Sequence, residues 1–303
     1  MNRTAGVSVV LPTFNRPGPL RVAIESVLAQ TYTDWELIIA DDGSDQATRE
    51  YLRSLDDPRI RALWLEHSGN PSIARNAAIA DARASLVAFL DSDDWWMPRK
   101  LETQLAAMAR KPQCLWSYGK EILVDAHGEP VVDPGIKEWR PYEGSIAGDL
   151  LRIEALISTP TVIVARSLLE LVGGFDAEQK FVGDYELWVR LALRSGVVAV
   201  SEPLVYVRIH REHYTGDRLG VHRGWCRLYR KFAGSIADSN LRALCRTSAA
   251  TSELQVAQIL WIRGEYRAAV AAVAHSSGEG WTHAAWWRKL LGLPVRALLR
   301  AWR

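Results

Sequence analysis

Short apolar runs alternate with amphipathic segments through the first 100 residues. Each run has the length of a buried strand, and each amphipathic segment repeats its apolar positions with a helical period. The expected strands cover residues 7–11, 35–40, 60–65 and 86–90. The expected helices between them cover residues 19–30, 45–55 and 72–84. This alternation predicts a doubly wound α/β sheet, in which ligands bind beyond the carboxyl ends of the strands.

The pattern is less regular after residue 100. Further strands are expected within residues 115–124, 161–164 and 203–209, and further helices within 99–110, 167–172 and 185–194. Residues 125–145 contain three prolines and indicate a loop-rich insertion. Beyond about residue 220 the segments favour helices, including a hairpin that turns at Gly264. We therefore expect two domains, residues 1–217 and a helical C-terminal region of residues 218–303.

Composition places the chain among globular proteins, since 48% of its residues are hydrophobic and 24% are charged. It lacks the run of about 18 apolar residues that a membrane-spanning helix needs, and residues 1–30 lack a signal-peptide core. The three cysteines have no C-x-x-C spacing, which disfavours a disulfide framework or a zinc site. We expect a cytoplasmic protein.

The net charge of +2 conceals an acidic body and a basic tail. Residues 1–203 carry 21 Lys and Arg against 29 Asp and Glu, whereas residues 204–303 carry 16 against 6. Residues 281–303 hold five basic residues, no acidic residue and four tryptophans. This composition predicts an interfacial helix that holds the protein peripherally on the inner face of the plasma membrane. Packing of the same apolar stripe on residues 220–274 is the alternative, and nucleic acid ranks third because no known binding module accompanies the charge.

Acidic residues stand at the ends of predicted strands and at the start of a helix. They are Asp41-Asp42, Asp91-Ser92-Asp93 and Asp184. Strand-end aspartates also cap helices or order turns, as Asp42 could do beside Gly43. Carboxylates that face each other at a sheet edge repel unless a cation or a hydrogen-bonding ligand joins them. Three such signals in this order favour a site for a divalent cation and a nucleotide diphosphate.

Five strings carry most of these polar residues. In chain order they are V-S-V-V-L-P-T-F-N-R (7–16), L-I-I-A-D-D-G-S (37–44), A-R-N-A-A (74–78), F-L-D-S-D-D-W-W-M-P (89–98) and G-D-Y-E-L-W-V-R-L (183–191). Together they resemble family 2 of the glycosyltransferases. The resemblance implies the GT-A fold, a Rossmann-like α/β arrangement with a mostly parallel central sheet flanked by helices.

The resemblance also implies roles for individual residues. Those expected to border the nucleotide or the donor sugar are Pro12, Thr13, Asn15, Asp42, Arg75, Asn76, Asp91, Ser92 and Asp93. Asp42 is expected to accept a hydrogen bond from the base, which in the family is most often uracil. Asp93 is expected to bind Mg²⁺ or Mn²⁺ directly, with Asp91, the other acid of the D-x-D element, toward the ribose or the donor sugar.

Asp184 aligns with the catalytic base of the inverting members of the family. Those members usually have E-D at this place, whereas this chain has Gly183-Asp184, so their acceptor contacts do not carry over. His210 is a further candidate ligand of the metal or the diphosphate. A surface histidine in a basic loop is the alternative for His210, and His213 is an equal rival. Arg208 could bind phosphate or be solvated.

The implied activity is inverting transfer of a sugar from a nucleotide donor, UDP-linked, to a glycan or lipid-linked acceptor. The chain lacks the Q-x-x-R-W string and the spanning helices of processive members, so one or a few additions per encounter are expected. A sugar nucleotidyltransferase is the nearest alternative, but the loop after the first strand is not Gly-rich with Arg and Lys. A non-catalytic nucleotide-sugar-binding scaffold is the other alternative.

Overall fold

The structure, a computed structural model, describes residues 5–131, 138–209 and 217–280. They form two compact units. The first comprises the described residues up to Ala177 together with Asp184 to Ile209, and the second comprises Glu178–Gly183 and the described residues from Asp217 onward. The expected domain boundary near residue 217 stays a prediction, although the stretch Glu178–Gly183 joins the second unit well before that position.

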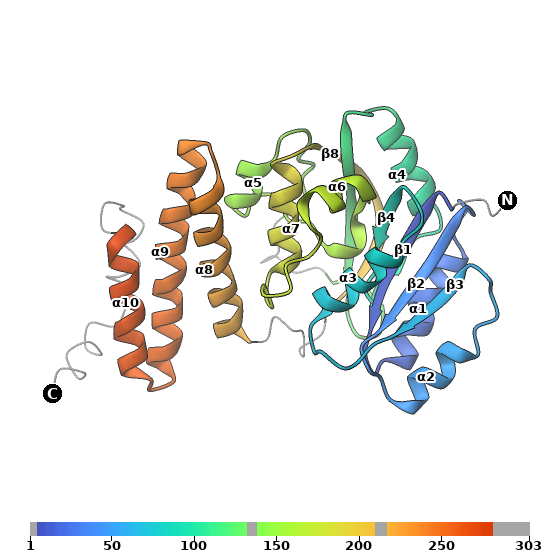
Figure 1. Cartoon of the computed structure of the whole chain (residues 1–303), viewed down its shortest axis with the longest axis horizontal. Coiled ribbons are helices and arrows are strands. Elements are labelled where there is room, and N and C mark those ends of the chain that lie inside the picture. The colour runs from blue at the N-terminus through green and yellow to red at the C-terminus, as the bar shows by residue number, and fades with distance from the viewer. Residues whose placement is uncertain (1–4, 132–137, 210–216, 281–303) are drawn as a thin grey trace. The chain divides into compact units, whose positions relative to one another are not determined.

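The first unit is built on one eight-stranded sheet with the order β3-β2-β1-β4-β7-β6-β8-β5. Figure 1 labels β1 to β4 and β8 of this sheet. Its strands are β1 (Val7–Thr13), β2 (Trp35–Asp41), β3 (Ile60–Trp64), β4 (Leu86–Phe89), β5 (Trp95–Trp96), β6 (Cys114–Val124), β7 (Ile163–Ala165) and β8 (Gly196–Arg208). The pairings among β1 to β4 and between β6 and β8 are parallel, while β5 and β7 run antiparallel to their neighbours. The predicted α/β class with a mostly parallel sheet is confirmed.

Helices connect the parallel strands, as the alternating pattern predicts. Those of the first unit are α1 (Pro17–Leu28), α2 (Gln46–Arg53), α3 (Pro71–Asp81), α4 (Lys100–Ala109), α5 (Ala147–Leu151), α6 (Arg166–Val172) and α7 (Gly183–Ala192), with a 3₁₀ turn η1 (Thr159–Thr161). The helix starts have sequence signals: α1 and α3 carry proline in the first turn, and Asp45 and Asn70 cap α2 and α3 by accepting bonds from backbone N–H groups.

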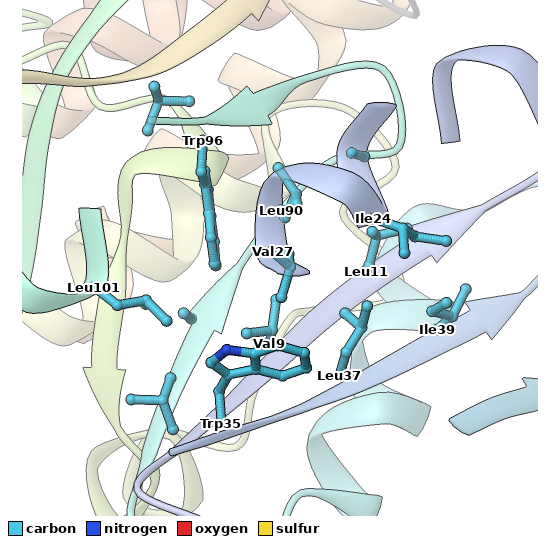
Figure 2. Packing of buried hydrophobic residues seen from close by; sticks show 14 of the residues in the cluster. Val9, Leu11, Ile24, Val27, Trp35, Leu37, Ile39, Leu90, Trp96 and Leu101 are labelled. Carbon is cyan, nitrogen blue, oxygen red and sulfur yellow. The ribbon is translucent and has the colours of Figure 1, made fainter. Parts of the chain in front are cut away.

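The main core lies between the sheet and the helices α1, α2 and α4. Alternate residues of β1 (Val7, Val9, Leu11) and β2 (Trp35, Leu37, Ile39) pack there against α1, and Trp96 and Leu101 complete the cluster (Figure 2). The other set of alternate residues, such as Val10 and Ile38, is also fully buried, and α3 packs on β1 and β2. Both faces are covered, which is why these strands have no polar alternation.

The second unit is helical, as expected beyond residue 220. It contains α8 (Arg218–Ser235), α9 (Ser239–Ile262) and α10 (Tyr266–Gly280), and Gly264 makes the predicted turn between the last two with a φ of +80°. The segment Glu178–Gly183 packs on α8, where a Cβ at Gly220 would lie 2.3 Å from the Phe181 ring. The glycine therefore permits the close approach of Phe181 to the helix.

Candidate active site

The loops after β1, β2 and β4 begin at the same edge of the sheet. Thr13 at the end of β1 is in register with Asp41 at the end of β2, and the Asp42 N–H donates to the Thr13 carbonyl over 2.9 Å. β4 pairs with β1 on the other side, where the Leu90 N–H donates to the Val10 carbonyl. The first loop, the Asp42 loop and the D-x-D loop therefore share one carboxyl edge, as the topology requires.

Asn15 joins the first loop to the second. It adopts a left-handed conformation with φ of +52°, its N–H donates to Ser44 Oγ over 3.0 Å, and its Oδ1 accepts from the Asp45 N–H over 2.6 Å. Asparagine tolerates this backbone region better than most residues. Pro12 and Thr13 are buried in β1, and Thr13 Oγ1 has no hydrogen-bond partner within the described part of the chain.

Asp42 is buried and is held by the loop that precedes α3. Its Oδ1 accepts bonds from the Ser68 N–H and hydroxyl, at 2.9 and 2.8 Å, and its Oδ2 accepts from the Gly69 N–H at 3.0 Å. A carboxylate offers about four acceptor positions, so one position remains for a further donor. The contact of His67 Nδ1 with Oδ2, at 3.2 Å, lies beside it.

Two aromatic residues beside Asp42 were not among the expected site residues. The rings of Phe14 and His67 stack with centroids 4.0 Å apart and planes 18° apart, although Phe14 keeps 38% of its surface exposed. An exposed, flat aromatic pair is well suited to contact a planar ligand. The signal was available in the sequence for Phe14, which lies inside the first motif string, but not for His67, whose partner is remote.

The two acids of the D-x-D element are each paired with an arginine from another part of the chain. Asp91 Oδ1 lies 2.5 Å from a terminal nitrogen of Arg75, on α3. Asp93 Oδ2 accepts from Arg16, which directly follows Asn15 in the first loop. Ser92 between them is buried. The structure thus brings Arg75, Asp91, Ser92 and Asp93 together, and adds Arg16 to the predicted set.

A third carboxyl lies next to this pair. Asp94 is buried, and that burial, reinforced by the negative charges of Asp91 and Asp93, raises its pKa well above the ordinary value. Its Oδ1 accepts from the Arg208 N–H over 2.8 Å. The charge of Glu121, on β6, also raises the pKa of Asp94. Burial raises the pKa of Glu121 itself to about 7, although a hydrogen bond with Ser158 acts in the opposite direction. The site therefore concentrates carboxyl groups, and the buried ones are shifted toward their uncharged forms.

Replacement of Glu121 by glutamine is expected to stabilise the protein at neutral pH. The wild-type carboxyl has a raised pKa in the folded state, so from pH 4.5 to 7 the unfolded chain loses its proton first. The free energy of unfolding then falls as pH rises, by up to about 3 kcal/mol, and levels off above about pH 7. Glutamine does not titrate and removes this fall.

Urea unfolding at pH 5 and pH 8 measures this effect, and the advantage of Glu121→Gln over wild type should be larger at pH 8. Glu202→Gln, at an exposed position of β8, is the matched control and should show the same small difference at both pH values. An advantage that does not change with pH would contradict the prediction.

Asp184 lies at the start of α7 and is linked to the same region through one short turn. Its Oδ2 accepts from the Thr159 hydroxyl over 3.2 Å and its Oδ1 from the Tyr185 N–H over 2.8 Å. The preceding Ser158 bonds Glu121, and the following Pro160 carbonyl accepts from the Trp96 indole over 2.9 Å. The turn at 158–161 thus connects Asp184 with the strand that follows the D-x-D element.

The remaining candidates have contacts that were not expected. The Asn76 side chain is engaged with the backbone of Phe175, donating over 2.7 Å and accepting over 2.9 Å. Arg208 donates to the carbonyls of Asp93 and Ala126, at 3.2 and 2.6 Å, and its guanidinium lies 5.0 Å from the Trp95 ring centroid. His210 lies outside the described residues, so its proposed role stays a prediction.

The donor set fits a hard divalent cation that is shared with a ligand. Asp91 and Asp93 offer carboxylate oxygens, and their like charges repel unless a cation or an arginine compensates them. Over residues 5–131, 138–209 and 217–280, no three His, Cys, Asp or Glu side chains form a group that could hold a metal by themselves. One or two carboxylates plus the oxygens of a diphosphate would complete such a shell.

Comparison with known proteins places this geometry in a family. The model described as "Glycosyl transferase family 2" matches residues 8–130. The UDP-Glc:alpha-D-GlcNAc-diphosphoundecaprenol beta-1,3-glucosyltransferase WfgD of Escherichia coli is 31% identical over 195 residues, which are 64% of this chain and 73% of WfgD. The chain belongs to glycosyltransferase family 2. As a family 2 glycosyltransferase it is an enzyme, which sets aside the nucleotidyltransferase and the non-catalytic scaffold.

Solved structures agree with the GT-A fold of this glycosyltransferase. Staphylococcus aureus TarS 1–349 in complex with UDP-GlcNAc has a TM-score of 0.62 at 17% identity, over 89% of this chain and 88% of that one. The mannosyltransferase PcManGT from Pyrobaculum calidifontis, in complex with GDP-Man and Mn²⁺, has a TM-score of 0.61 at 17% identity, over 99% and 84%. At these identities the likeness concerns the fold.

The expected membrane contact of this glycosyltransferase concerns residues 281–303, which lie outside the described residues. No helix in the described part of the chain combines the length and the apolar character needed to cross a bilayer. Attachment through the basic tail stays a prediction.

Proposed function

We propose that this glycosyltransferase moves a sugar from a UDP-linked donor to a hydroxyl of a lipid-linked glycan, with inversion at the anomeric carbon. The observation that carries the proposal is the convergence of three loops at one carboxyl edge. The first loop and α3 supply Arg16 and Arg75 to the D-x-D acids, and the turn at 158–161 ties Asp184 to the same region.

The nucleotide would lie along the first two loops. Asp42 keeps one acceptor position after its bonds to Ser68 and Gly69, which suits an N–H of the base. The stacked rings of Phe14 and His67 beside it would contact the plane of the base. Thr13 Oγ1, buried and without a partner among the described residues, is a further group that a bound nucleotide could satisfy.

Asp93 and Asp91 would hold Mg²⁺ or Mn²⁺ together with the donor diphosphate. When bound there, the cation supplies positive charge against the charge that grows on the leaving diphosphate. Mn²⁺ in the complex of PcManGT supports a divalent metal in this fold. The neighbouring Arg75 would add a permanent positive charge, since it is buried beside Asp91 and its guanidinium lies 5.2 Å from the Phe175 ring centroid.

Asp184 would act as the general base. Its carboxylate is oriented by two donors, Thr159 and Tyr185, and retains acceptor capacity for the proton of the acceptor hydroxyl. As that proton moves to Asp184, the hydroxyl oxygen bonds to the anomeric carbon and the bond from this carbon to the diphosphate breaks. The nucleoside diphosphate leaves, and no covalent intermediate with the enzyme is needed.

The proposed class of acceptor is inferred from the described activity of a relative. WfgD is described as acting on alpha-D-GlcNAc-diphosphoundecaprenol, and 73% of its length aligns with this chain. A sugar attached to a polyprenyl diphosphate is therefore the acceptor class that we propose first. A single addition per encounter stays a prediction.

A donor panel tests the proposed function. The full chain is incubated with Mn²⁺, a synthetic GlcNAc-diphosphate lipid and UDP- or GDP-linked sugars, and nucleoside diphosphate release is measured. We expect acceptor-dependent release of UDP, and an inverted linkage in the product by proton NMR. Pyrophosphate release, a retained linkage or acceptor-dependent turnover of GDP-sugars alone would contradict the proposal.

A further inference from the structure

The two acids of the D-x-D element differ in how deeply their arginine partners are placed. The Arg75 side chain, paired with Asp91, is only 11% exposed. The Arg16 side chain, paired with Asp93, is 45% exposed, while Asp93 itself is 11% exposed. An ion pair with one buried partner and one solvated partner can exchange the solvated partner at little cost, because water receives that charge.

The backbone just before Arg16 is held in place by hydrogen bonds. Asn15 is bonded to Ser44 and Asp45, so the first loop is held at the site whether or not Arg16 contacts Asp93. Arg16 precedes α1, which begins with Pro17, and it makes no side-chain cap of that helix. Movement of the guanidinium therefore requires rotation of a long side chain but no rearrangement of the loop or the helix.

Electrostatics explains why Arg16 pairs with Asp93. Asp91 and Asp93 stand two residues apart in one loop, and each contacts an arginine from elsewhere in the chain. The Arg16 guanidinium brings a positive charge to Asp93, as Arg75 does to Asp91. A divalent cation on Asp93 would compete for the same carboxylate oxygens.

We propose that Arg16 is an exchangeable counter-ion, which neutralises Asp93 in the donor-free enzyme and moves to the donor diphosphate when the cation binds. The inference rests on the proposed function and deepens it, because it assigns Arg16 to the diphosphate. Guanidinium groups match carboxylate and phosphate oxygens equally well, so one side chain can serve both states. Because of this exchange, we expect the affinity for the cation to be low without nucleotide and higher when the nucleotide is bound.

Two binding measurements on the full chain test this inference. In the first, calorimetry follows Mn²⁺ binding without nucleotide. Arg16→Gln removes the competing guanidinium, so its affinity for Mn²⁺ should rise, roughly 3- to 10-fold. In the second, UDP is titrated at saturating Mn²⁺, and the same variant should bind UDP about 10-fold more weakly because a phosphate contact is lost. The two shifts have opposite signs.

Arg99→Gln is the matched control. Arg99 pairs with Glu102 on the surface and is 65% exposed, so this variant has the same change in net charge and should leave both affinities as in wild type. Arg16→Lys keeps a positive charge but loses the guanidinium geometry, so in both measurements it should lie between wild type and Arg16→Gln. Thermal melts of all variants check that they are folded.

The possible outcomes separate this inference from the proposed function. Unchanged or weaker Mn²⁺ binding by Arg16→Gln overturns the counter-ion role, and unchanged UDP binding overturns the transfer to the diphosphate. A wild type that binds Mn²⁺ but not UDP contradicts the UDP-linked donor of the proposed function. In that case Mn²⁺ with inorganic pyrophosphate replaces UDP in the second measurement, so Arg16 is still tested.

Discussion

Asp184→Asn should lower kcat about 1000-fold and leave the dissociation constant of UDP within about 2-fold of wild type. The amide cannot take up the proton of the acceptor hydroxyl, but it has nearly the shape of the carboxylate. The Tyr185 N–H can still donate to Oδ1, and the Thr159 hydroxyl can rotate to accept from the amide. The loss would therefore appear in the chemical step and not in donor binding.

Steady-state rates of UDP release with acceptor, and UDP titration by calorimetry, measure the two quantities. Asp56→Asn is the control, since Asp56 is exposed in the loop before β3, at the edge of the sheet opposite the site. It should have wild-type values in both assays. Turnover by Asp184→Asn at the wild-type rate would remove this residue from the mechanism.

The second large effect is a contrast between neighbouring acids. Asp93→Asn should lower activity about 1000-fold, with part of the activity recovered at high Mn²⁺, because a formal charge at the proposed cation site is lost. Asp94→Asn should stay within about 3-fold of wild type. Burial and the charges of Asp91 and Asp93 raise the pKa of Asp94, which favours its uncharged form. Asparagine, also uncharged, can accept the same bond from the Arg208 N–H.

Activity measured against Mn²⁺ concentration for both variants checks this contrast. The pair is internally matched, because the two changes are chemically the same and lie one residue apart. Equal losses in the two variants would show that Asp94 is as important as Asp93, and a metal-independent loss in Asp93→Asn would argue against its role as a cation ligand.

The sheet was predictable because its signals are local. Strands β1, β2 and β4 are continuous buried runs, and the helices between them have proline or capping residues at their starts. Strand β8 begins at Gly196, well before the expected start near residue 203, and its pairing with β6 is irregular around Gly119 and Lys120. The two-residue strand β5 has no periodicity that a sequence pattern could register.

The acids of the candidate site were visible in the sequence, but their partners were not. Arg16 and Asp93 are 77 residues apart, and the tie from Asp184 to the D-x-D region runs through a turn at Thr159 that carries no motif. Such pairs depend on the tertiary arrangement of loops, which local propensity does not encode. Asn76 illustrates the converse, since a motif residue is used to hold the backbone of Phe175.

Lys100, in the core, is a further residue whose environment the local sequence does not predict. A lysine at the start of an amphipathic helix is expected in solvent, yet this one is fully buried, with Nζ 4.1 Å from the centroid of the Trp96 ring. Burial lowers the pKa of Lys100 well below its ordinary value. The position of Trp96, which depends on the pairing of β5 with β8, determines this environment, and no pattern around residue 100 indicates it.

The stretch Glu178–Gly183, which packs with the helical unit, has a consequence for how the enzyme can be divided. Gln179 donates to the Gly224 carbonyl over 2.8 Å, Arg227 donates to the Glu178 carbonyl, and Asp184 is the next residue in the chain. A gene fragment that stops before α8 would encode all eight strands of the described sheet yet deprive the backbone leading into the proposed base of those contacts. Truncation is therefore a poor route to a minimal transferase, and the helices belong in any shortened version meant to retain turnover.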